Sequence, residues 1–173
     1  MPNYTLGPED GILAVRTSRT GAIAKAGHDL LMHVTEWSAT LDTGDAPTLT
    51  LDAAGTSLRV REGTGGIKPL DDDDLTNIET TIDDEVLRKR DITFRSTSVQ
   101  LNGDTVAIAG DLTLLGTTRP VAFDLALVDG RVTGAAVVKQ SEWGMKPYTA
   151  LFGTLKVADE VRVEIDAALP QSR

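Results

Sequence analysis

Alternation of apolar and polar residues predicts β-strands through most of the second half of the chain. In residues 119–128, for example, Val121, Phe123 and Leu125 occupy every second position, and Asp124 falls on the opposite face. A period of two places one face of a strand in the core and the other in solvent, as in an antiparallel sheet. We expect four further strands in this half, at residues 92–101, 104–115, 131–140 and 155–169.

Short segments with turn-forming residues connect these strands. Asn102-Gly103-Asp104 and Asp129-Gly130 are typical of tight hairpins. Residues 116–120 link another pair of strands, and Pro120 suits the first position of a strand because it lacks the N–H that the interior of a sheet requires. The four strands between residues 92 and 140 are therefore predicted to form an up-and-down meander.

The first half of the chain shows a less regular strand pattern. Residues 29–42 are predicted to form one long strand, in which Leu31, Trp37, Ala39 and Leu41 share a face. Shorter strands are expected at residues 11–17 and around residues 49–51 and 58–60.

One segment, residues 71–89, has the pattern of a helix. Leu75, Ile78 and Ile82 recur at spacings of three or four residues, and the run Asp71–Asp74 precedes them. Carboxylates at the start of a helix interact favourably with its dipole. Four consecutive carboxylates would splay around the helix axis, whereas a calcium loop needs alternating ligands. The run therefore favours a solvated helix start over a calcium site.

The number of strands points to a mainly β protein. Nine or ten strands and one helical insertion are not divided by any linker rich in Pro, Gly or Ser. An antiparallel barrel accommodates so many strands without leaving unpaired edges. We therefore expect a single domain over residues 1–173.

The composition bears on how such a barrel is filled. The chain has 22 Thr, 14 Val and 8 Ile, which favour strands, but only seven aromatic residues. Gly110, Gly134 and Ala136 fall on predicted inward faces. An eight-stranded barrel can be filled by side chains or can hold one small ligand. Narrow inward residues are compatible with an apolar cavity, and solid packing remains the alternative.

Charge and cysteine content exclude several classes of protein. A net charge of −9 disfavours binding to nucleic acid and to anionic membranes, because both need clustered Lys and Arg. The absence of cysteine excludes disulfides and thiolate sites. No run of eighteen apolar residues suggests a membrane span, and the first residues do not resemble a secretion signal. We expect a cytoplasmic protein, or a periplasmic or secreted one if a leader has been removed.

Few residues suggest reactive chemistry. His28 and His33 are five residues apart, so on a regular strand they face opposite sides and are poorly placed to share a metal. His28 with Asp29 could contact a ligand head group at the barrel mouth, serve a hydrolase, or lie on the surface. No nucleophile elbow or phosphate loop is present. We therefore expect no catalytic residues and no metal site.

Four motifs resemble a known family. Residues 110–121, Gly-Asp-Leu-Thr-Leu-Leu-Gly-Thr-Thr-Arg-Pro-Val, resemble the signature of the YceI-like family of lipocalin-like polyisoprenoid-binding proteins. The strand around Phe94-Arg95-Ser96 resembles the family's Phe-x-Ser strand, Ser141–Met145 its Asp-Phe-Gly segment, and Asp159–Ile165 its last strand. The motifs follow one another in the family's order. Trp143 stands where Phe is usual.

The resemblance implies a lipocalin-like, eight-stranded antiparallel barrel that holds a long isoprenoid along its axis. Family ligands are polyprenyl pyrophosphates and isoprenoid quinones, and family members can pair, so a homodimer is an expectation. No cofactor is expected apart from such a bound lipid or quinone, which would be the partner. The candidate cations do not cluster, which favours an uncharged head group: Lys25, Arg95, Arg119, Lys139 and Lys146.

The expected cavity lining consists of the large apolar residues on the inward faces, with His28 as a possible head-group contact. These residues are Trp37, Phe94, Ile108, Leu112, Val121, Phe123, Leu125, Trp143 and Phe152. The function that follows is the sequestration or transport of a long-chain apolar molecule. The alternative is a solid-packed barrel that acts as a stress-related scaffold or interaction module, with the tryptophans as ordinary core residues.

Overall fold

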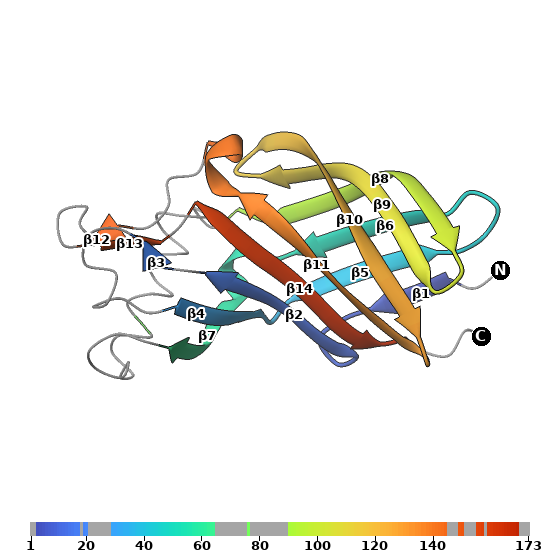
Figure 1. Cartoon of the computed structure of the whole chain (residues 1–173), viewed down its shortest axis with the longest axis horizontal. Coiled ribbons are helices and arrows are strands. Elements are labelled where there is room, and N and C mark those ends of the chain that lie inside the picture. Colours follow the sequence, from blue (N-terminus) through green and yellow to red (C-terminus); the bar gives the residue numbers. More distant parts are fainter. Residues whose placement is uncertain are drawn as a thin grey trace.

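The computed structural model describes residues 3–17, 19–20, 29–64, 76, 90–144, 149–150, 155–157 and 159–169. Apart from Thr76, the predicted helix at 71–89 lies outside these residues, as do His28 and Phe152. Figure 1 shows a curled sheet whose strands cross the molecule obliquely.

The described chain is built almost entirely from strands. Two 3-10 turns, η2 (Gly55–Ser57) and η4 (Gln140–Trp143), interrupt them. The strands are β1 (Asn3–Leu6), β2 (Gly11–Thr17), β3 (Arg19–Thr20), β4 (Asp29–Val34), β5 (Trp37–Asp42), β6 (Thr48–Ala53), β7 (Leu58–Thr64), β8 (Ile92–Asn102), β9 (Thr105–Leu114), β10 (Thr117–Val128), β11 (Arg131–Lys139), β12 (Thr149–Ala150), β13 (Leu155–Val157) and β14 (Glu160–Ala168).

Eleven of these strands form one antiparallel sheet, in the order β1-β5-β6-β8-β9-β10-β11-β14-β2-β4-β7. The lipocalin-like antiparallel fold is confirmed, but the expected number of eight strands is wrong. The extra strands arise because three runs of chain bend, and each gives two strands: β1 with β2, β4 with β5, and β6 with β7. β4 pairs with β2 and β7, whereas β5 pairs with β1 and β6. Both halves of the central run, β4 and β5, therefore keep the same two neighbouring runs.

The predicted meander between residues 92 and 140 is confirmed, since β8, β9, β10 and β11 pair in succession. Asp129 and Gly130 both have positive φ. Two such residues in a row are typical of the type I′ turn, whose twist matches that of the strands. Leu115 and Gly116 form a second turn of this kind, and β10 begins directly after it at Thr117. The expectation that Pro120 begins this strand is therefore wrong.

The predicted long strand at 29–42 is two strands, and its inward face changes. Trp37 and Leu41 are buried as expected, but in β4 the buried residues are Met32 and Val34 rather than Leu31. Thr35 and Glu36 lie between the two strands, and the buried positions change from even in β4 to odd in β5. A break of this kind exchanges the two faces, so a constant period of two selects the wrong residue.

The predicted strand at 155–169 is also two strands. β13 joins β12 and β3 in a separate three-stranded sheet, and β14 belongs to the main sheet. Figure 1 places this small sheet at the end of the molecule opposite β1. The two ends of the curled sheet therefore differ in structure.

The helical part of the described chain offers no membrane span. None of its helices is long and apolar enough to cross a bilayer.

Candidate functional site: an apolar cavity

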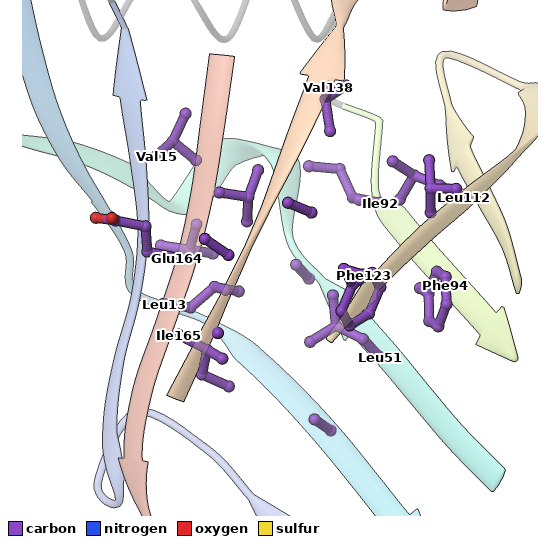
Figure 2. A pocket seen from close by; sticks show the side chains of 18 of the residues that line it. Leu13, Val15, Leu51, Ile92, Phe94, Leu112, Phe123, Val138, Glu164 and Ile165 are labelled. Atoms are coloured by element: carbon purple, nitrogen blue, oxygen red, sulfur yellow. The ribbon is translucent and has the colours of Figure 1, made fainter. Parts of the chain in front are cut away.

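The curled sheet encloses a cavity of about 270 Å³. Its wall is drawn from strands all around the sheet, and Figure 2 shows Leu13, Leu51, Ile92 and Ile165 among the side chains directed into it. An apolar cavity of about 150 Å³ is already large enough to bind benzene or xenon. The interior is therefore not packed solid, and the alternative with a filled barrel lacks its structural basis.

The structure brings five of the predicted lining residues together on the cavity wall: Phe94, Leu112, Val121, Phe123 and Leu125. Ile108, Trp37 and Trp143 are buried in the core but do not belong to this wall. His28 and Phe152 lie outside the described residues. The wall also contains many residues that the sequence analysis did not select, mainly Val, Leu, Ile and Ala from β2, β4, β6 and β14.

Two glycines in the sheet lie close to both the backbone and the wall side chains of a neighbouring strand. The rings of Phe94 and Phe123 pack with their centroids 5.4 Å apart, at 55°. A Cβ added to Gly110 would lie 2.6 Å from Cζ of Phe94, and one added to Gly134 would lie 2.5 Å from Cδ2 of Leu125. The nearest backbone atoms are as close, at 2.4 Å from the Arg95 carbonyl oxygen for Gly110 and 2.8 Å from the Asp124 carbonyl oxygen for Gly134, so a side chain at either position would collide with the adjacent strand.

One end of the cavity is closed by packed side chains. Val106 and Ala167 have no exposed surface, and Val99 and Ile108 are buried beside them without reaching the cavity. These residues lie toward the end of the sheet that carries the β8–β9 and β10–β11 hairpins. A ligand in the cavity would therefore have its inner terminus against this packed layer.

At the opposite end of the cavity, hydrogen bonds on both sides hold the 3-10 turn η4 in place. The indole N–H of Trp143, which is only 2% exposed, donates to the carbonyl of Leu112 at 2.8 Å. The backbone N–H and hydroxyl of Ser141 both donate to the carboxylate of Asp159. These hydrogen bonds, above all that from the hydroxyl, lower the pKa of Asp159. The turn therefore has a defined position over the edge of the cavity.

Among the described residues, three polar ones interrupt the apolar wall: Thr17, Gln140 and Glu164. Thr17 and Gln140 are 7% and 5% exposed. Sequence reasoning missed both because it selected only large apolar residues. The available signal was position, since Thr17 continues the inward series Leu13, Val15 on β2, and Gln140 follows Val138 at the same spacing.

The carboxylate of Glu164 is turned away from the cavity, as Figure 2 shows. It accepts a hydrogen bond from Nε of Arg16 on the neighbouring β2, and one at 2.8 Å from Nε of Arg162. The hydrogen bond from Arg16 is the main reason that the pKa of Glu164 lies below its usual value; partial burial opposes the shift and Arg162 adds to it. The Glu164 carboxylate therefore links β14 to β2 on the outer face of the sheet.

We expect Glu164→Gln to lower the free energy of unfolding by about 0.5–1 kcal/mol at pH 7, where the group is partly exposed and screened. The folded pKa is depressed, so the contribution is present above the unfolded pKa and is lost as the pH falls through the folded value. Urea unfolding should show a larger wild-type advantage at pH 7 than near pH 3. Glu160→Gln, at an exposed position of the same strand, is the control and should show little difference at either pH. An equal loss at both pH values would contradict this account.

The remaining candidate chemistry is sparse. Trp37 borders a shallow surface groove with Glu36, Asp52 and Asp91. Among the described residues, no group of three or more His, Asp or Glu could hold a metal ion. Asp52 is paired with Arg95 at 2.9 Å. The geometry of the described chain therefore points to the cavity as its distinctive site.

Comparison with known proteins agrees with this architecture. The profile of a family described as YceI-like domain matches residues 26–169. The crystal structure of BcnA from Burkholderia cenocepacia is similar with a TM-score of 0.59 and 15% identity, over 89% of this chain and 94% of that chain. A YceI protein from Campylobacter jejuni is similar with a TM-score of 0.58 and 15% identity, over 82% of this chain and 85% of that chain. At such identities the likeness shows the fold alone. No match was found among curated proteins.

Proposed function

Because the chain belongs to the YceI-like family, we propose that it is a soluble binding protein that sequesters or transports a long-chain isoprenoid, of the polyprenyl or isoprenoid quinone type. The single observation that carries this proposal is the cavity inside the curled sheet, whose described wall is hydrocarbon except at three residues. A cavity of this kind stabilises an apolar chain by removing it from water.

The energetics of burial are sufficient for useful affinity. Each methylene transferred from water to an apolar site contributes about 0.8 kcal/mol, so ten contribute about 8 kcal/mol. That is the scale of a micromolar dissociation constant before the entropic costs of binding are subtracted. The apolar chain of the ligand can therefore supply most of the binding free energy, and a charged head group is not required.

The proposal includes no catalysed reaction. Among the described residues of the wall, Glu164 is the only one with an ionisable side chain, and its carboxylate faces outward toward Arg16 and Arg162. Acid–base or nucleophilic catalysis needs a reactive group inside the site. This arrangement supports binding rather than hydrolysis.

The test is to identify what the purified protein carries and what it can take up. We expect organic extracts to yield an isoprenoid by mass spectrometry. We also expect the delipidated protein to bind the uncharged fluorophore N-phenyl-1-naphthylamine with saturable enhancement of its emission. A long-chain prenol such as geranylgeraniol should displace the fluorophore. Protein that yields no lipid and binds neither compound would refute the proposal.

A further inference from the structure

The hydroxyl of Thr17 is buried and has no hydrogen-bond partner among the described residues. Thr17 is 7% exposed, and it lies on the cavity wall. A buried polar group without a partner destabilises the fold, so such groups normally have a protein, water or ligand partner. The side chain therefore marks a position where a bound molecule could supply the missing partner.

A second polar side chain stands at the same end of the cavity. Gln140 follows β11 and is 5% exposed. β14 alone lies between β11 and β2, so the two strands are about 10 Å apart. The backbone N–H of Gln140 donates to the carbonyl of Asp159 at 2.8 Å, which fixes the start of η4. Thr17 and Gln140 thus give one end of an otherwise apolar cavity a polar border.

The two ends of the cavity are chemically different. The inner end is the packed layer around Val106 and Ala167, and the outer end carries Thr17 and Gln140. A molecule with an apolar body and one polar terminus matches this polarity in a single orientation. Its body would lie against the hydrocarbon wall and its polar terminus beside the Thr17 hydroxyl.

We propose that Thr17 selects ligands that carry an uncharged oxygen, as a carbonyl, hydroxyl or ether, at one end of an apolar body. This inference rests on the proposed function and deepens it by naming the recognised head group. A hydroxyl can donate to such an oxygen without any compensating charge. An anionic head is disfavoured because the described wall contains no Lys or Arg, and an unpaired charge is far more costly to bury than a neutral group.

The experiment uses three probes with the same isoprenoid chain: farnesene, farnesol and farnesyl phosphate. Their dissociation constants are measured with the full delipidated chain by displacement of N-phenyl-1-naphthylamine. In the wild type, farnesol should bind more tightly than farnesyl phosphate by at least tenfold. Thr17→Val keeps the shape of the side chain and removes only its hydroxyl. It should weaken farnesol about five- to tenfold, the effect of one neutral hydrogen bond, and leave farnesene unchanged.

Two further measurements separate ligand recognition from a structural role. The urea midpoint of ligand-free Thr17→Val should equal or exceed that of the wild type, because the lost hydroxyl bonds to no residue in the part of the chain that the structure describes. Thr133→Val, at an exposed position on β11, should alter neither stability nor the affinity for any probe.

Equal changes for farnesol and farnesene in Thr17→Val, or no change in either, would overturn the inference, as would a preference for farnesyl phosphate. Equal changes for farnesol and farnesene are the result expected if a water molecule, rather than the ligand, is the partner of the Thr17 hydroxyl. If farnesene and farnesol both fail to bind the wild type, the proposed function fails instead.

Discussion

Replacing Ala136 by Phe is expected to weaken ligand uptake about a hundredfold while leaving the protein folded. Ala136 lies on β11, pairs with Val163 of β14, and both residues belong to the cavity wall. A ring at this position would occupy space that three or four methylenes of the ligand would otherwise fill. At about 0.8 kcal/mol each, their loss amounts to about 2.4–3.2 kcal/mol. That corresponds to roughly a hundredfold in the dissociation constant.

The neighbouring residue provides a matched control. Val137 is on the same strand but faces outward and is 58% exposed, so Val137→Phe adds comparable apolar area outside the cavity. The dissociation constant of N-phenyl-1-naphthylamine should rise in Ala136→Phe and remain at the wild-type value in Val137→Phe. Because the new ring enters existing space, the urea midpoint of Ala136→Phe should stay close to that of the wild type. Undiminished uptake by a folded Ala136→Phe variant would show that the ligand binds elsewhere.

The sequence predicted the parts of the fold that repeat regularly. Within β9 the buried Val106 and Leu114 occupy even positions, and within β10 the buried Leu125 occupies an odd position, so each strand follows a period of two and the parity changes only at the turn between them. The Asp129-Gly130 turn was predictable because two positive φ angles demand residues that tolerate the left-handed region.

Irregularities in the ladder were not predictable from alternation. Besides the change of face between β4 and β5, the pairing of β8 with β9 shifts between Ser96 and Ser98. The buried residue of β8 is Phe94 before this shift and Val99 after it, so the inward face changes from even to odd positions. Because a bulge is set by contacts with the partner strand, nothing in the local sequence fixes its position.

The sequence indicated the kind of site, an apolar cavity, but only some of the residues that line it. Of the large apolar residues predicted to face inward, Phe94, Phe123 and Leu125 lie on the cavity wall. Trp143 does not lie there, since its indole N–H donates to the carbonyl of Leu112. Its position depends on the direction of η4, which only the folded chain determines. The role of Gly110 also required the structure, because the sequence does not show which atoms of the neighbouring strand lie close to this glycine.

Gly110→Ala is expected to lower the free energy of unfolding by about 1–3 kcal/mol or more, the usual cost of overpacking a core. The added Cβ would lie 2.4 Å from the carbonyl oxygen of Arg95, 2.6 Å from Cζ of Phe94 and 2.7 Å from Cα of Ser96. Two of these three atoms belong to the backbone of β8, so the strands themselves would have to separate. Urea unfolding measures this loss.

Two comparisons show whether close approach of the strands is the cause. Gly103→Asn is the control, because a Cβ at that hairpin position meets no atom within 4 Å and Asn tolerates its φ of 64°. It should cost less than about 1 kcal/mol. Combining Gly110→Ala with Phe94→Leu removes the ring contact but leaves both backbone contacts, so it should not restore stability. Full recovery in that double variant would instead assign the requirement for glycine to the Phe94 ring. The wall pair Phe94 and Phe123 would then depend on Gly110 for its packing, while the spacing of β8 and β9 would not.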